Sequence, residues 1–149
     1  MSETVETILL YTIGAGLLSI VYGFFTGKNI LNQSAGNAKM QDIASAIQIG
    51  AKAYLARQYK TIALVGVVVL VIVSIAFSPL VGLGYLVGAA LSGIAGYVGM
   101  LVSVEANVRT AEASRKGLAQ GLSVAFKSGA VTGMLVAGLA LLAIAVYYY

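Results

Sequence analysis

Charged residues divide this chain into a few long uncharged stretches, and these stretches limit what it can fold into. No charged residue occurs within residues 7–27, 61–104 or 128–149, which are stretches of 21, 44 and 22 residues. A membrane with a hydrocarbon core of about 30 Å is crossed by about 20 helical residues at about 1.5 Å each. The first and last stretches therefore fit one crossing each, and the middle stretch fits two.

The composition excludes an ordinary soluble domain. Hydrophobic residues make up 60% of the 149 residues and charged residues only 9%, whereas soluble domains carry about 25% charged residues. The chain has no cysteine and no histidine. It therefore forms neither a disulfide scaffold nor a Cys/His zinc site, and it has no thiol nucleophile and no histidine base.

The single proline, Pro79, lies within the middle stretch, close to Ser78, Gly82 and Gly84. A helix interior is hard to sustain there, so we expect a turn that separates two crossings. We predict an all-α transmembrane fold, a four-helix polytopic bundle in a single transmembrane domain. Its predicted helices cover about residues 5–26, 37–77, 83–116 and 120–148.

Basic residues fall in only two segments of the chain. All nine lysines and arginines lie within residues 28–60 or 109–127, whereas the N-terminal tail has two glutamates and the turn at Pro79 has no charge. The positive-inside rule then places both basic segments in the cytoplasm and both chain ends outside, an N-out/C-out topology. The acidic start and long apolar run favour a retained first helix over a cleaved signal peptide.

The net charge of +4 follows from this topology and does not indicate a nucleic-acid partner. No arginine-rich stretch with interleaved aromatic residues, as found in nucleic-acid interfaces, occurs in the sequence. We therefore expect a lipid bilayer, and no nucleic acid, around this chain.

The first basic segment has the pattern of a helix. Apolar residues recur three or four positions apart from Met40 to Leu55, as in an amphipathic helix, and Asn37 is a suitable N-cap. We predict one continuous helix over 37–77 that projects into the cytoplasm. The rival interpretation is a separate amphipathic helix that lies on the membrane surface.

The second basic segment continues the third helix. Glu105–Arg109 and Glu112–Lys116 are spaced i,i+4 with the acid first, the order that stabilises a helix by about 0.2–0.5 kcal/mol per pair. Gly117 suits the end of this helix. We expect the two helices that the turn at Pro79 separates, over 37–77 and 83–116, to extend beyond the bilayer.

Small residues recur every four positions in three of the predicted helices. In lipid such residues allow close backbone approach between helices, so we interpret these stripes as packing faces. On this interpretation Gly88→Leu disrupts packing and lowers the yield of folded protein. The alternative, a pore lined by glycines, lacks a ring of polar residues. The stripes are Ala15, Ser19, Gly23 and Gly27; Gly84, Gly88, Ser92 and Gly96; and Gly129, Gly133 and Ala137.

No Asp, Glu, Lys, Arg or His falls within a predicted membrane span. Proton and ion carriers usually keep such a group at depth, which disfavours a rotary-ATPase proteolipid and a small multidrug exporter. The cytoplasmic acids Asp42, Glu105 and Glu112 lie far apart in the sequence and lack metal-ligand spacing. We therefore assign no catalytic, cofactor-binding or metal-binding residue to this chain.

Two long segments resemble the membrane-bound, ion-translocating inorganic pyrophosphatases. The stretch GNAKMQDIASAIQIGAKAYLARQYKTIALVGVV from Gly36 resembles the second-helix region of that family. The stretch from Gly96, which contains ANVRTAEA and SVAFKSGAVTGM, resembles the third and fourth helices. The resemblance covers nearly the whole chain in order and spacing, and is weakest over residues 1–33.

This resemblance implies a sixteen-helix homodimeric pump that hydrolyses pyrophosphate with Mg²⁺ and moves H⁺ or Na⁺ out of the cytoplasm. In that family the aspartate-rich motifs, the catalytic lysines and the ion gate lie on inner helices that begin with the fifth. The four helices here resemble the outer ring, so no catalytic residue is carried over and this chain alone is expected to be inactive.

We expect the chain to be the first quarter of such a pump, in the plasma membrane of a prokaryote, with the remaining helices as its partners. The alternative is a stand-alone four-helix membrane scaffold or accessory subunit without enzymatic activity.

Overall fold

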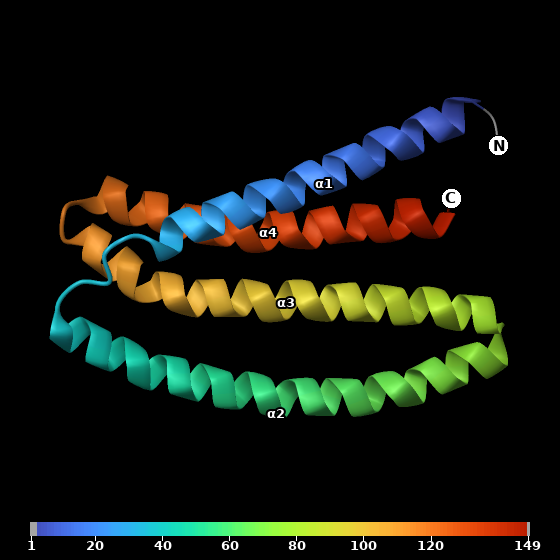
Figure 1. Ribbon diagram of the computed structural model, residues 1–149. Coiled ribbons are helices and arrows are strands. Elements are labelled where there is room, and N and C mark those ends of the chain that lie inside the picture. The colour runs from blue at the N-terminus through green and yellow to red at the C-terminus, as the bar shows by residue number, and fades with distance from the viewer. Residues whose placement is uncertain (1–2, 149) are drawn as a thin grey trace.

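The computed structural model describes residues 3–148, which form four long helices joined by short connections (Figure 1). They are α1 (Glu3–Leu31), α2 (Ala38–Ala76), α3 (Pro79–Ser114) and α4 (Leu118–Tyr148). All four are long and apolar enough to cross a membrane. The predicted all-α transmembrane class with four helices is confirmed. Compared with the predicted ranges, α1 is longer at both ends and α3 starts four residues earlier.

Local capping explains where the helices begin. The Asn37 side chain accepts a hydrogen bond of 3.0 Å from the Met40 N–H, so the predicted N-cap is confirmed. Ser78 caps α3 by accepting from the Val81 N–H at 3.3 Å, and Pro79 is the first helical residue. Proline has no N–H to lose at that position and its φ is already helical. The turn is therefore confined to Phe77 and Ser78, and α3 starts before residue 83.

The second helix is continuous over its 39 residues, with a gentle curve and no break (Figure 1). At about 1.5 Å per residue it is about 58 Å long, roughly twice the thickness of a bilayer core. This agrees with the predicted single helix and argues against a separate amphipathic helix before the membrane crossing.

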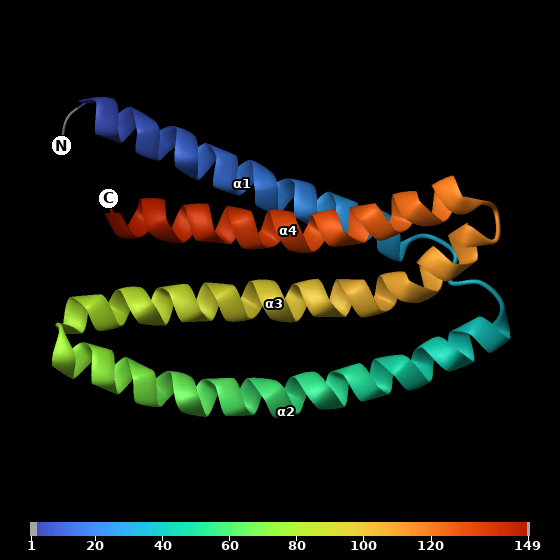
Figure 2. The ribbon, with the colours of Figure 1, turned by 180° about the vertical axis from the view of Figure 1, so that it is seen from behind.

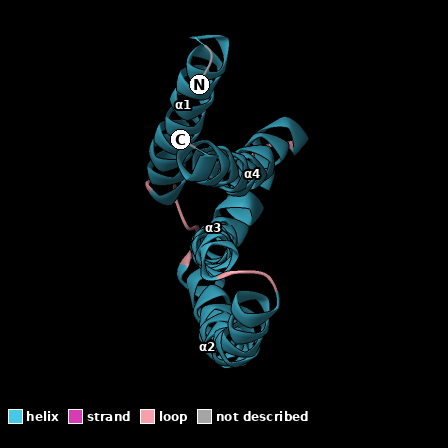
Figure 3. Cartoon of the chain, turned by 90° about the vertical axis from the view of Figure 1, so that its right-hand side faces the viewer, coloured by secondary structure: helices cyan, strands magenta, loops and turns pink. Residues whose placement is uncertain are grey.

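The helices lie in a row in the order α1, α4, α3, α2 (Figure 1; Figure 3, viewed along the helices). Helix α4 packs against both α1 and α3, and within residues 3–148 α2 contacts only α3. The connections 32–37 and 115–117 lie together at one end of the bundle, measured along the helix axes, and we call this the loop end. The start of α1, the α2–α3 turn and the end of α4 lie at the other, as the view from behind also shows (Figure 2).

The buried core lies where α1, α3 and α4 meet near the loop end. Ile30 from α1, Ala106 from α3, and Val124 and Val131 from α4 are each at most 5% exposed. Because α2 lies outside this group, its most apolar 18-residue window has no buried residue. Most of its apolar surface therefore faces outward.

Small residues form the α1–α4 interface. Ser19, Gly23 and Gly27 are buried on α1, so three members of that predicted stripe are confirmed, whereas Gly16 replaces Ala15 as the fourth buried position. A Cβ built at Gly138 of α4 would lie 2.8 Å from the backbone oxygen of Gly16. Glycine at 138 is thus required for this approach.

The predicted stripe of α4 does not form its contact face, and that of α3 does so only in part. A Cβ at Gly84 would lie 2.8 Å from Tyr147 Cζ, and one at Gly96 would lie 3.0 Å from the Tyr59 hydroxyl. Gly88 and Ser92 of α3 and Gly133 of α4 are exposed, and a Cβ at Gly88 or Gly133 would meet nothing within 4 Å. The contact face of α3 instead carries Ala95 and Gly99. A spacing of four does not by itself place a stripe on a contact face, since the same spacing is buried in α1 and exposed in α4. The expected effect of Gly88→Leu therefore has no support from the packing of these four helices, and it stays a prediction.

Candidate functional site

Arg109 is the centre of the polar contacts at the loop end. It lies on α3, and its side chain is only 13% exposed. One guanidinium nitrogen, Nη1, donates to the carboxylate of Glu105 at 3.1 Å and to the Glu105 backbone oxygen at 2.6 Å. The predicted Glu105–Arg109 pair is confirmed. The Arg109 side chain is largely buried, whereas that of Glu105 is 36% exposed, so the pair is partly shielded from solvent and its hydrogen bonds are worth more than those of a fully exposed ion pair.

The same side chain reaches the last residue of α1. Nη2 of Arg109 donates a hydrogen bond of 2.9 Å to the backbone oxygen of Leu31. The last four carbonyls of a helix have no partner within the helix, and that end carries partial negative charge. Arg109 therefore satisfies an otherwise unpaired carbonyl of α1 and places a positive charge at its C-terminal end.

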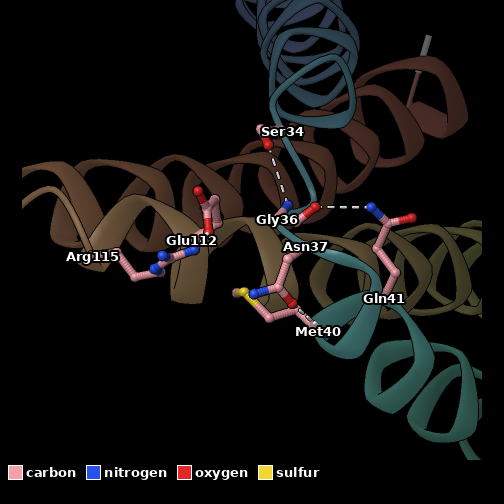
Figure 4. A network of polar contacts seen from close by, with 7 residues as sticks. All are labelled: Ser34, Gly36, Asn37, Met40, Gln41, Glu112 and Arg115. Carbon is pink, nitrogen blue, oxygen red and sulfur yellow. Dashed lines mark hydrogen bonds and ion pairs between the residues drawn. The ribbon is translucent and has the colours of Figure 1, made fainter.

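The connection between α1 and α2 is shaped by short-range hydrogen bonds (Figure 4). The Gly36 N–H donates to Ser34 Oγ at 3.2 Å, and the Gly36 oxygen accepts from Nε2 of Gln41 at 2.9 Å. Gly36 has a φ of +79°, and a Cβ there would lie 2.6 Å from Met40 Sδ and 3.0 Å from an oxygen of Glu112. Only glycine fits this backbone conformation and this space.

Glu112 pairs with a different partner from the one predicted. Its carboxylate contacts Arg115 at 3.0 Å, and the expected i,i+4 pair with Lys116 is wrong. The reason is that α3 ends at Ser114, and Gly117 takes a φ of +143°. Lys116 lies beyond the helix and no longer shares a face with Glu112, whereas Arg115 at the C-cap still does.

The acidic side chains of α3 near the loop end take part in ion pairs within that helix and its C-cap. Glu105 and Glu112 are each paired with an arginine, and Asp42 is exposed on α2. Within residues 3–148 no three acidic side chains come close enough to hold a metal ion. No site residue was assigned from the sequence. Sequence reasoning missed the contact between Arg109 and Leu31, which has no local signal because the partner is a backbone oxygen.

A second set of contacts joins α2 to α3 about midway along the two helices. The Tyr59 hydroxyl donates to the backbone oxygen of Gly93 at 2.8 Å, and the Tyr59 and Tyr97 rings meet edge to face with centroids 5.4 Å apart. Beyond this contact an apolar groove of about 860 Å³ runs between the two helices, lined in part by Leu70 and Leu86. The exposed face of α2 and this groove form a large apolar surface.

Comparison with known proteins identifies related sequences over most of the chain. The sequence profile of the family described as inorganic H⁺ pyrophosphatase matches residues 17–149. The chain is 47% identical over 130 residues to a K⁺-insensitive pyrophosphate-energized proton pump of Methanosarcina mazei. It is 40% identical over 129 residues to a putative K⁺-stimulated pyrophosphate-energized sodium pump of Clostridium tetani.

These alignments cover 86% and 87% of this chain but only 19% of each relative. A pyrophosphate-energized proton pump of Moorella thermoacetica gives the same result, with 38% identity over 135 residues, 90% of this chain and 20% of the relative. The chain thus spans about a fifth of the length of the relatives that it matches.

Proposed function

This chain belongs to the inorganic H⁺ pyrophosphatase family, and from this membership we propose that it supplies four outer helices of a membrane pump. The pump would couple pyrophosphate hydrolysis to the movement of H⁺ or Na⁺ out of the cytoplasm. The observation that carries the proposal is the family match over residues 17–149, which includes α2, α3, α4 and half of α1. Relatives named as proton pumps and as sodium pumps both match this region.

The proposed topology has the loop end in the cytoplasm and both chain ends outside. All nine basic residues lie within residues 28–60 or 109–127, which include both connections of the loop end and the half of α2 nearer to it; Lys60 lies just past the middle of α2, and α1 begins with two glutamates at the opposite end. This asymmetry supports the assignment through the positive-inside rule. The proposed location is the plasma membrane of a prokaryote, and the proposed complete pump is a homodimer.

The remaining helices of the same pump are the proposed partners. The membrane-spanning part of α2 contacts only α3 among residues 3–148, and Val67, Val71 and Ile75 are each more than half exposed. This apolar surface can be covered by lipid or by further helices. The relatives are long enough to contain such helices, because this chain covers only about a fifth of their length.

Magnesium is the proposed metal of the complete pump, and the residues of this chain do not fit it. Mg²⁺ takes near-octahedral oxygen ligands, usually including one or two carboxylates together with phosphate oxygens. The carboxylates of Glu105 and Glu112 already face arginines, and Asp42 lies apart from both. We therefore propose that Mg²⁺ and pyrophosphate bind outside these four helices and that the chain alone does not hydrolyse pyrophosphate.

A chimeric pump tests this proposal. The matched N-terminal region of the Methanosarcina mazei pump is replaced by this chain, and pyrophosphate-driven proton uptake is measured in inverted membrane vesicles. We expect the chimera to retain hydrolysis and pumping, and the 149-residue chain alone to have neither. The control is the same chimera with Gly138→Leu, which blocks the contact of α4 with α1 and is expected to lower the amount of folded pump.

Two results would contradict the proposal. Pyrophosphate hydrolysis by the purified chain alone would place a catalytic site within these helices. A chimera that is folded and dimeric by size-exclusion chromatography but does not hydrolyse pyrophosphate would instead favour the alternative of a stand-alone scaffold.

A further inference from the structure

An open cavity of about 450 Å³ lies at the loop end, between the end of α3, the start of α4 and the connection that follows α1. Three of its lining residues are cations, Arg109, Lys116 and Lys127, and one, Glu112, is an acid. The helix contacts described above account for Arg109 and Glu112. They leave the two lysines without a structural role.

The balance of charge in this cavity is positive. Glu112 is paired with Arg115, and Arg109 is paired with Glu105. Neither Lys116 nor Lys127 takes part in an ion pair within the part of the chain that the structure describes. Two lysines therefore line the cavity without an ion pair of their own, beside the Glu112 carboxylate that is paired with Arg115.

The cavity is also lined by hydrogen-bond donors other than the two lysines. Arg109 lines it, and the Nε of this side chain is buried and has no acceptor among residues 3–148. Helix α4 begins at Leu118 beside the cavity, and the first N–H groups of a helix carry partial positive charge. The side-chain amides of Gln33 and Gln120 also line it, and Gln33 Nε2 donates one hydrogen bond of 3.5 Å to Asn29 Oδ1. Cations and donors that converge on one space match the oxygen atoms of an anion.

The cavity lies beside the start of the uncharged stretch 128–149, and this position points to a phosphate group. Lys127 is the last charged residue before the uncharged stretch 128–149, so it lies at the boundary of the fourth membrane span. On the adjoining face of α4, Leu122 is 64% exposed and Phe126 is 74% exposed. A basic pocket beside exposed apolar residues at this level matches a phospholipid head group and its chains.

We propose that this cavity binds a phosphate group, with Lys116 and Lys127 as its principal contacts. The phosphate can belong to an anionic phospholipid or be free in solution, since the donors recognise the oxygens common to both. The site uses only residues of this chain, so its test is independent of whether the chimeric pump described above is active.

The experiment uses the 149-residue chain in nanodiscs and has two arms. In the first arm the nanodiscs contain phosphatidylcholine with increasing phosphatidylglycerol, and retained phosphatidylglycerol is counted by native mass spectrometry. In the second arm the nanodiscs contain phosphatidylcholine alone, and binding of inorganic phosphate is titrated by calorimetry. The test variant is Lys116→Gln/Lys127→Gln. Both lysines are exposed and take part in no side-chain hydrogen bond or ion pair found within residues 3–148, so we expect the variant to fold.

The matched control is Lys52→Gln/Lys60→Gln, which removes two charges from α2 outside the cavity. We expect the test variant to bind about 30-fold more weakly and the control to change by less than about threefold. Loss in the first arm identifies a lipid phosphate, and loss in the second identifies free phosphate. The proposal is overturned if neither arm detects binding, or if the test variant and the control bind equally well.

Discussion

Arg109 Nη2 lies 2.9 Å from the backbone oxygen of Leu31, a residue 78 positions earlier in the chain. This hydrogen bond joins α3 to the C-terminal end of α1, next to the buried residues Ile30 and Ala106. It positions the connection 32–37 over α3, where Gly36 lies against Glu112. The loop end is therefore held by one largely buried guanidinium.

Arg109→Ala is expected to destabilise the folded chain by about 2–3 kcal/mol. The substitution removes charge-assisted hydrogen bonds to Glu105 and Leu31 and leaves a helix-terminal carbonyl without a partner. The measurement is the melting temperature in detergent, from fluorescence-detected size-exclusion chromatography after heating. The control is Arg115→Ala, whose side chain is 61% exposed and whose ion pair is worth less than about 1 kcal/mol. Equal melting temperatures for the two variants would contradict the role given to Arg109.

Gly138→Ala is expected to weaken the packing of α1 on α4. The added Cβ would lie 2.8 Å from the Gly16 oxygen and 2.9 Å from Ser19 Cβ, so the helices must move apart, at a cost of about 1–3 kcal/mol. Gly133→Ala is the matched control on the same helix, because a Cβ there meets no atom of residues 3–148 within 4 Å. The same thermal assay should show a loss for Gly138→Ala alone. A melting temperature as high as that of the control would mean that these two helices are not in close contact.

The features that could be predicted from sequence are those set by nearby residues. The number of helices follows from uncharged runs of membrane-spanning length. Asn37 could be identified as a cap because its side chain bonds a backbone N–H only three residues later. Pro79 was correctly interpreted as a boundary, but the helix starts at the proline itself because Ser78 caps it.

The features that could not be predicted depend on which helix packs against which. A stripe such as Gly88 and Ser92 does not specify whether a neighbour covers it, and here none of the other three helices does. Lys116 was expected to pair with Glu112, and the pairing changed because Gly117 ends the helical geometry first. The bond from Arg109 to the Leu31 oxygen has no side-chain partner that a sequence pattern could reveal.

Gly36→Ala and Gly50→Ala are expected to change stability in opposite directions. Gly36 has a φ of +79° and has Met40 and Glu112 within 3.0 Å of a Cβ, so alanine is both strained and crowded there. Gly50 lies inside α2, is exposed, and has nothing within 4 Å of a Cβ. Alanine at position 50 should stabilise the helix by about 0.5–1 kcal/mol. A melting temperature that rises for both variants would contradict the described conformation of the α1–α2 connection.

The proposed membrane orientation is tested by labelling single cysteines, because the native chain has none. Phe77→Cys reports the α2–α3 turn, since Phe77 is 75% exposed and, unlike Ser78, its side chain does not cap α3. Asn32→Cys reports the loop end, at an exposed position. With a membrane-impermeant maleimide on intact bacterial cells, we expect Cys at position 77 to react at once and Cys at position 32 to react only after the membrane is opened. The reverse order would place the basic segments outside and would contradict the positive-inside assignment.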